Sequence, residues 1–120
     1  MSKILNLTQH PASPEQVAQG VFEPKNKTKV QRALTFNSLP TKEEIVSRAK
    51  ELADIAKEHN VSKVMIGGAP YLMSALETAM HEANITPLYA FAERDVVEAT
   101  QPDGSVIKKS VFKHVGFVEA

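Results

Sequence analysis

The sequence contains no cysteine. This absence excludes disulfide bonds, thiolate zinc sites and a cysteine nucleophile. It fits a reducing compartment, so we expect a cytoplasmic protein. No apolar run approaches the roughly 18 residues that a membrane span requires, and the first residues, MSKILNLTQHP, have too short an apolar stretch for a signal peptide. We therefore expect no membrane partner.

The sequence also has no excess of positive or negative charge. The 14 Lys and Arg residues balance the 14 Asp and Glu residues, so the formal net charge is zero. Proteins that bind long nucleic acids usually carry a basic field, and we expect no such partner here. A protein with no net charge can still bind a small anion in one local pocket. What is present is a 42% apolar content over 120 residues, enough for a single domain spanning residues 1–120.

Three apolar runs predict short strands at Lys3–Thr8, Val64–Gly67 and Leu88–Ala92. Capping boxes that begin at Ser13 and Thr41, together with apolar residues at the helical period, predict helices between these strands. The predicted helices cover residues 13–20, 28–34, 41–60 and 70–84, with a loop as the alternative around residues 28–34. Alternating strands and helices favour right-handed crossovers and a parallel sheet.

The C-terminal third has a different pattern. The turn residues Pro102-Asp103-Gly104 separate two β-branched runs, which predicts a long antiparallel hairpin over Asp95–Val115. The predicted fold is a three-layer, Rossmann-like α/β domain whose first three strands are parallel and are extended by this hairpin. Because the hairpin is too long for a 120-residue monomer to use fully, we expect a homodimer with the hairpin at or near its interface.

Each predicted parallel strand ends in a polar or glycine-rich segment: Thr8-Gln9-His10, Gly67-Gly68-Ala69-Pro70-Tyr71 and Glu93-Arg94-Asp95. Ligands of open parallel sheets bind beyond the carboxyl ends of the strands, so the three segments should meet at one edge. The amides of Ala69, Tyr71 and Leu72 should lie at the positive end of a helix, which favours an anion there. The alternative is that the two glycines only form a tight turn.

His10 and Arg94 are the candidate catalytic residues. Pro11 biases His10 toward an extended conformation near its strand end, where its ring could serve as a general base or donate to a phosphate. Arg94 could bind a phosphate or carboxylate with two donors. The alternatives are a loop histidine that bonds to nearby backbone and an arginine that forms a salt bridge with Glu93, Asp95 or Glu98.

His114 is the remaining candidate for ligand binding, together with Thr8, Gln9 and the glycine segment. Pairing outward from the hairpin turn places it near Ala92 and Glu93, facing the same edge or serving only as a structural histidine. No two histidines have the spacing of metal ligands, so we expect neither a metal nor another cofactor.

Four segments together carry a family resemblance: ILNLTQHPASPEQ, MIGGAPYLM, LYAFAERDVVE and VFKHVGFV. They resemble a family of short, uncharacterised bacterial and prophage-encoded proteins, which brings no known catalytic residues. The first segment is also similar to the start of small CRISPR-associated Rossmann-like proteins, some relatives of which bind or cleave cyclic oligoadenylates. That resemblance implies a nucleotide ligand by analogy of fold alone.

Two functional hypotheses follow. The first is binding of a small anionic, nucleotide-like ligand at the strand ends, with phosphodiester hydrolysis as an added activity. It expects Thr8, Gln9, His10, Tyr71 and Arg94 to point into one open pocket. The alternative is a non-catalytic interaction module that forms a homodimer through its hairpin, and it expects those groups to be satisfied by one another and by backbone.

Overall fold

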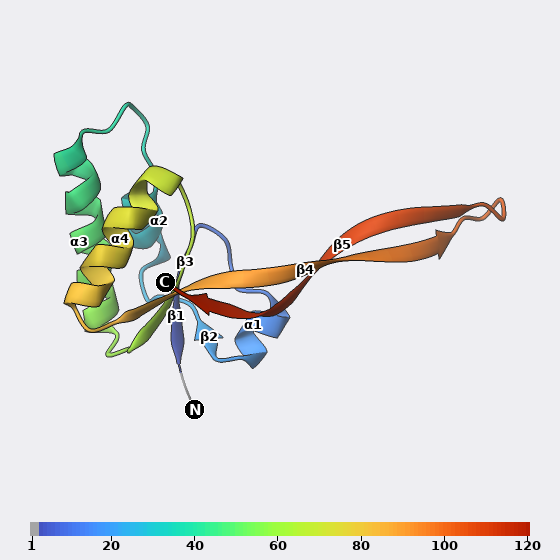
Figure 1. Cartoon of the computed structure of the whole chain (residues 1–120), viewed down its shortest axis with the longest axis horizontal. Helices are drawn as coiled ribbons and strands as arrows, with labels where there is room; N and C mark the ends of the chain where they lie inside the picture. The colour runs from blue at the N-terminus through green and yellow to red at the C-terminus, as the bar shows by residue number, and fades with distance from the viewer. Residues whose placement is uncertain (1–2) are drawn as a thin grey trace.

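The computed structural model describes residues 3–120, with the side chains of Asp95, Val97 and Ser110 outside that description. The chain forms one sheet, with helices packed beside it and a long hairpin that projects from it (Figure 1). The elements follow the order β1 (Ile4–Leu7), α1 (Pro14–Ala18), β2 (Val21–Phe22), α2 (Lys27–Leu34), α3 (Lys42–Glu58), β3 (Lys63–Ile66), α4 (Pro70–Glu82), β4 (Thr86–Thr100) and β5 (Val106–Glu119).

The strands lie in the order β2-β1-β3-β4-β5. β1 runs parallel to both β2 and β3, β3 runs parallel to β4, and β4 and β5 are antiparallel. The prediction that β1, β3 and β4 are mutually parallel is therefore confirmed. The edge strand β2 was not predicted, because two residues are too few to show a strand period.

The two faces of the sheet are covered very unequally. Alternate side chains of β1 and β3 pack on α2, α3 and α4 and form the main core, which includes Leu5, Leu7, Val64 and Ile66. The opposite side chains form a small cluster of Ile4, Val21, Met65 and Leu88, against which Ala12 and Phe117 pack. Since α1 is the helix on that side and has only five residues, the structure shows a mixed α/β fold and does not confirm three full layers.

The signals predicted at Ser13, Thr41, Asn60 and Asn84 mark helix ends in the structure, whereas the Asn26 cap of α2 was not predicted. Ser13 and Gln16 form the capping box of α1, and Asn26 and Thr41 cap α2 and α3 through their side chains. The helical interpretation of residues 28–34 is thus confirmed over the loop alternative. Asn60 and Asn84 follow α3 and α4 with positive φ values of 54° and 59°. None of the helices in the described part of the chain is long and apolar enough to cross a membrane.

The hairpin extends far beyond the rest of the molecule (Figure 1). β4 pairs with β3 only over Thr86–Leu88, whereas its pairing with β5 continues to Thr100. Gly104, with φ of 85°, takes the left-handed position in the predicted turn. The radius of gyration is 17.1 Å, compared with about 14 Å for a compact domain of this length, so the hairpin gives the protein an elongated shape.

Candidate ligand site at the strand ends

A cleft of about 520 Å³ lies where β1 and β3 end and β4 leaves the sheet. We call it the strand-end cleft, and it is lined by Thr8, Gln9, His10, Pro11, Ser13, Gln16, Met65, Ile66, Gly67, Gly68, Tyr89 and Ala90. Its volume lies within the range of about 300–1,000 Å³ that is typical of small-molecule sites. Five predicted site residues meet in it: the catalytic candidate His10 and the ligand-binding candidates Thr8, Gln9, Gly67 and Gly68.

A buried asparagine shapes the loop that carries His10. Asn6 on β1 is only 1% exposed. Its Oδ1 accepts hydrogen bonds from the Thr8 amide at 3.0 Å and the Thr8 hydroxyl at 2.7 Å. Its Nδ2 donates to the His10 carbonyl at 2.9 Å and to the Glu23 carboxylate at 3.1 and 3.2 Å. Because Glu23 also accepts from the Ala12 amide at 3.0 Å, the loop is fixed at both ends.

Sequence reasoning missed this network. The signal for it was a polar side chain inside an otherwise apolar four-residue strand, since buried polar side chains nearly always have hydrogen-bond partners. The partner Glu23 lies 17 residues away from Asn6. Only the parallel pairing of β1 with β2 brings the segment that follows β2 beside this loop.

Thr8 and Gln9 are largely engaged by the protein itself. The Thr8 hydroxyl is directed at Asn6, and Gln9 Nε2 donates to the Leu34 carbonyl at 3.5 Å and to Thr35 Oγ1 at 3.3 Å. His10 differs from them, because its side chain is exposed and lines both the strand-end cleft and a small neighbouring hollow. His10 is therefore the side chain best placed to meet an incoming ligand.

Glycine is present at positions 67 and 68 for different structural reasons. Gly68 has φ of 149°, a conformation that side-chain-bearing residues rarely adopt, so the turn itself requires glycine there. Gly67 is not among the glycines with positive φ. A Cβ atom at Gly67 would meet Thr8 Cγ2 at 3.6 Å, an ordinary contact. The backbone thus explains Gly68 as a turn residue, whereas Gly67 leaves room at the wall of the cleft.

The start of α4 does not form the predicted cradle of three free amides. The Leu72 amide donates to the Ala69 carbonyl at 3.0 Å, so the prediction that it is free is wrong. The Tyr71 ring packs edge-on against Phe36, with ring centroids 5.4 Å apart, and lines a groove between α3 and α4 instead. Ala69 and Tyr71 are not among the residues that line the strand-end cleft.

Arg94 and His114 also lie outside the lining of the cleft. Arg94 is opposite Phe112 in the projecting hairpin and has an interaction of its own within the protein. Its predicted alternative partner Asp95 lies outside the described side chains.

His114 pairs with Ala92, close to the predicted register. Its Nε2 lies 2.8 Å from Gln19 Oε1, and its ring lies 4.9 Å from that of Phe117. The Gln19 side chain also donates to the Val115 carbonyl at 3.3 Å. These contacts fasten the residue that ends α1 to the base of β5, which is the structural role left open as the alternative.

Tyr89 connects the cleft to the helical layer. Its hydroxyl donates to Glu77 Oε2 on α4 at 2.6 Å. Burial raises the pKa of Tyr89 to about 12, and the hydrogen bond and negative charge of Glu77 act in the same direction. The Tyr89 hydroxyl is therefore neutral at ordinary pH and is committed to Glu77.

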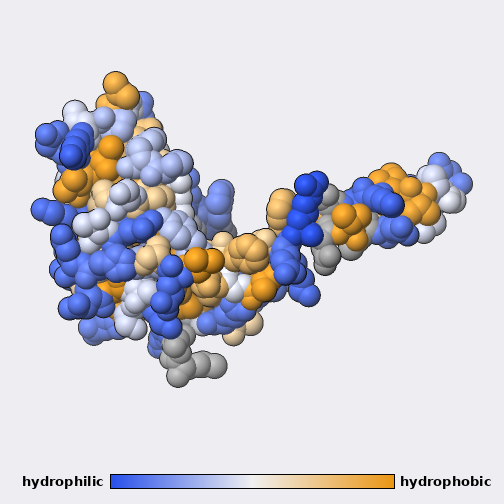
Figure 2. Space-filling model, viewed as in Figure 1, coloured by the Kyte–Doolittle hydropathy of each residue, from blue (hydrophilic) through white to orange (hydrophobic). Residues whose placement is uncertain are grey.

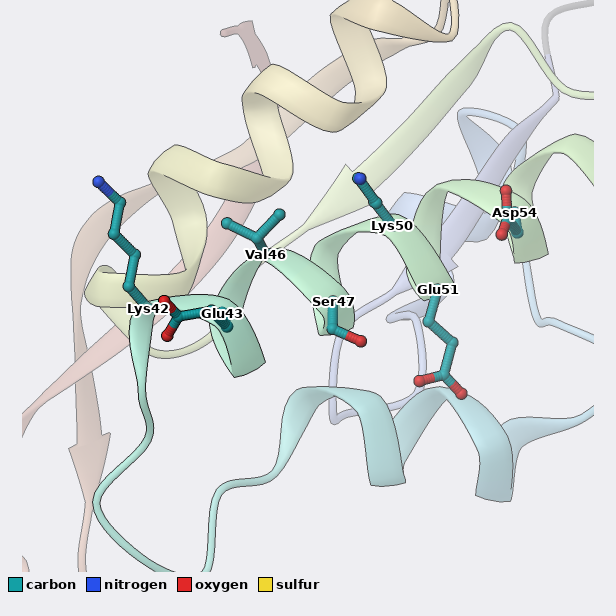
Figure 3. Close-up of a pocket in the computed structure, with 7 residues that line it drawn as sticks. All are labelled: Lys42, Glu43, Val46, Ser47, Lys50, Glu51 and Asp54. Carbon is teal, nitrogen blue, oxygen red and sulfur yellow. The ribbon is translucent and has the colours of Figure 1, made fainter.

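Another hollow, of about 630 Å³, runs along the outer surface of α3. All seven residues that line it belong to that helix, and the side chains of Ser47 and Glu51 point away from those of Val46 and Lys50 (Figure 3). Because its polar groups do not converge, it is a weaker candidate than the strand-end cleft. Among the described residues, no group of His, Asp and Glu is arranged to hold a metal ion.

The structure defines a small mixed α/β protein with a cleft at the carboxyl edge of a mostly parallel sheet and a projecting hairpin. The chain belongs to the Uncharacterized protein MJ1673 family, whose family model matches residues 2–118. No curated protein and no solved structure matches it. The predicted resemblance to an uncharacterised family is confirmed in that form, while the comparisons give no support for a CRISPR-associated relative or for a bacterial or prophage origin.

Proposed function

We propose that the protein binds a small anionic, nucleotide-like ligand in the strand-end cleft. The observation that carries this proposal is the meeting of His10 and Gly67 in one cleft at the carboxyl edge of β1 and β3. This is the edge at which open α/β sheets of the Rossmann type bind ligands. We further propose that the parallel strands and their helices form a Rossmann-like arrangement.

The lining of the cleft suggests how such a ligand would lie. The exposed His10 ring can donate to a phosphate oxygen, and Gly67 lets a ligand approach the backbone closely. Pro11, Met65 and Ala90 supply an apolar wall for a base or another flat group. If a phosphodiester is hydrolysed here, we propose His10 as the general base. A contribution of Arg94 remains a proposal that shortening the hairpin can test.

The proposal predicts that His10→Ala weakens the binding of the anion by roughly tenfold to a hundredfold, which corresponds to the loss of one charge-assisted hydrogen bond. Isothermal titration with inorganic phosphate and with nucleoside monophosphates and cyclic oligonucleotides would measure it. Gly67→Ala should also weaken binding, because it narrows the cleft while making only an ordinary contact with Thr8.

His81→Ala is the matched control, since His81 is an exposed histidine on α4 that does not line the cleft. It should bind as the wild type does. The proposal fails if the wild type binds none of these anions, or if His10→Ala and His81→Ala bind the selected anion equally well.

We propose homodimerisation through the hairpin as the second candidate function, that of a non-catalytic interaction module. Two observations favour it. Thr8 and Gln9 are satisfied by the protein's own groups, and the projecting part of the hairpin carries bulky apolar side chains that are more than half exposed (Figure 2). Sedimentation velocity should then show a dimer at tens of micromolar protein, about the range expected for an interface of moderate affinity.

A further inference from the structure

We propose that a second copy of the chain packs against one face of the projecting hairpin, the face that carries Val96, Val106 and Phe112. The part concerned, residues 91–115, is called the hairpin arm below. This inference rests on the second candidate function and deepens it, because it names the face and the pairing of charges that would form the dimer.

The register of the arm decides which side chains share a face. Directly paired residues lie on the same face, and residues two apart along a strand do too. Since Arg94 pairs with Phe112 and Thr100 pairs with Val106, one face holds Phe112, Val106 and the intervening Val96. These three side chains are 77%, 57% and 60% exposed. The same face also holds Arg94 and the charged pair of Glu98 and Lys108. We call this the Phe112 face.

The bulky apolar side chains described on the opposite face are less exposed. This face carries Ile107 and Val111, which are 44% and 39% exposed, together with the charged pair of Glu93 and Lys113. Among its described residues, the one exposed aromatic side chain is Phe91. Phe91 lies at the base of the arm, next to the shift in strand register between Phe91 and Ala92. Among the described side chains, the Phe112 face therefore offers the larger exposed apolar surface for a partner.

The arm also needs a partner on general grounds. A two-stranded hairpin alone is at best marginally stable in water, and three or more strands or a packed face are needed for independent stability. Beyond its base, where His114 and Val115 contact Gln19 at the end of α1, the arm stands clear of the helices in Figure 1. The core clusters contain none of the arm's described side chains.

The charges of the arm point to a second copy as that partner. On the Phe112 face, β4 contributes Arg94 and the acidic Glu98, while β5 contributes Lys108, which pairs with Glu98 within the arm. Laying β5 on the same strand of another copy would bring the two Lys108 side chains together on this face. An arrangement with two-fold symmetry that lays Glu98 of each arm against Lys108 of the other pairs opposite charges in both copies at once.

Two adjacent substitutions test which face is used. Phe112→Lys and Val111→Lys introduce the same charge at neighbouring positions on opposite faces of β5. We expect Phe112→Lys to raise the dissociation constant of the dimer by about thirtyfold or more, as for a central interface residue. Val111→Lys should stay close to the wild type. Circular dichroism of both variants checks that the sheet and helices are retained.

The outcomes separate the two proposals. A wild type that is monomeric by sedimentation at tens of micromolar overturns both homodimerisation and this inference. A wild-type dimer that is weakened equally by both variants, or more by Val111→Lys, overturns the Phe112 face while homodimerisation stands.

A mixing experiment tests the pairing of acidic with basic strands. Glu98 and Lys108 are opposite each other within one arm. Glu98→Lys and Lys108→Glu chains each lose this pairing, but an equimolar mixture restores it between copies. We expect each variant alone to dimerise at least tenfold more weakly than the mixture. The exposed pair Lys57→Glu and Glu58→Lys on α3 makes the same changes in net charge away from the arm, and mixing them should have no such effect. Recovery that is no greater than in this control overturns the charge pairing.

Discussion

At the scale of a single residue, the ionisation of the Tyr89 hydroxyl should make the stability of the protein depend on pH. Its pKa of about 12 in the folded state lies above the ordinary value of 10.0, mainly because the side chain is partly buried and then because it donates to Glu77. Between these pH values the unfolded chain has lost a proton that the folded protein keeps. This contribution to stability is therefore fully present below about pH 10 and is lost as the pH rises to about 12.

Absorbance at 295 nm would test this prediction in the Tyr71→Phe variant, where Tyr89 is the one remaining tyrosine. We expect a single ionisation with a pKa of about 12. Glu77→Gln in the same background should lower the pKa of Tyr89 only in part, because burial is the largest cause of the shift. Ionisation at the ordinary value would contradict the buried hydrogen bond.

At the scale of elements, Arg48 on α3 holds the end of α2. Its Nη1 donates to the carbonyls of Arg32 and Thr35, each at 2.6 Å, and its Nη2 donates to Glu44 Oε1 at 3.1 Å. The guanidinium also lies 4.7 Å above the centre of the Phe36 ring. A cation at the C-terminus of a helix satisfies carbonyls that have no partner within the helix.

We predict that Arg48→Met lowers the free energy of unfolding by about 1.5–3 kcal/mol, the usual cost of losing hydrogen bonds to a charged group. Methionine keeps an apolar stem of similar length, so the change removes mainly the charge and its donors. Urea unfolding would measure the loss. Lys50→Met, an exposed position on the same helix, should stay within about 0.5 kcal/mol of the wild type, and an equal loss in both variants would refute the role of Arg48.

At the scale of the whole molecule, the arm and the body should be separable. The buried core contains residues from β1, β2, β3, the start of β4 and α2, α3 and α4, and none of the described side chains of residues 91–115. We predict that replacing residues 94–112 by Asn-Gly leaves a folded protein, because Glu93 and Lys113 are already paired and this dipeptide favours a tight hairpin turn. The melting temperature and the far-ultraviolet circular dichroism would show it.

The shortened chain also separates the two proposed functions. It should bind the anion selected by titration as the wild type does, since the residues that line the strand-end cleft are all retained. It should also be monomeric. Loss of anion binding in a folded, shortened chain would instead assign Arg94 or another residue of the arm to the ligand site.

Elements whose signals are local were predictable from the sequence. Ser13, Thr41, Asn60 and Asn84 mark helix ends through their own side chains or their tolerance of positive φ, and the structure places all four as predicted. The parallel direction of β1, β3 and β4 followed because each connection contains a helix. These features depend on residues only a few positions apart or on one general rule of chain connection.

The composition of the site was predictable only in part. Thr8, Gln9, His10, Gly67 and Gly68 meet because strand ends of a parallel sheet share an edge, a rule that needs no side-chain detail. Arg94 was placed at a strand end that does not exist, since β4 continues without a break into the hairpin. An apolar run followed by charged residues looks the same whether the strand ends there or leaves the sheet.

The sequence by itself thus determined where the helices begin and end, the direction of the parallel strands and the edge at which a cleft would lie. Only the tertiary structure decided that Asn6, Glu23 and the His10 loop form one hydrogen-bonded network, that Leu72 uses its amide and that His114 contacts α1. The physical reason is range. Caps, turns and periods act over a few residues along the chain, whereas these contacts join segments that meet only after the sheet has been assembled.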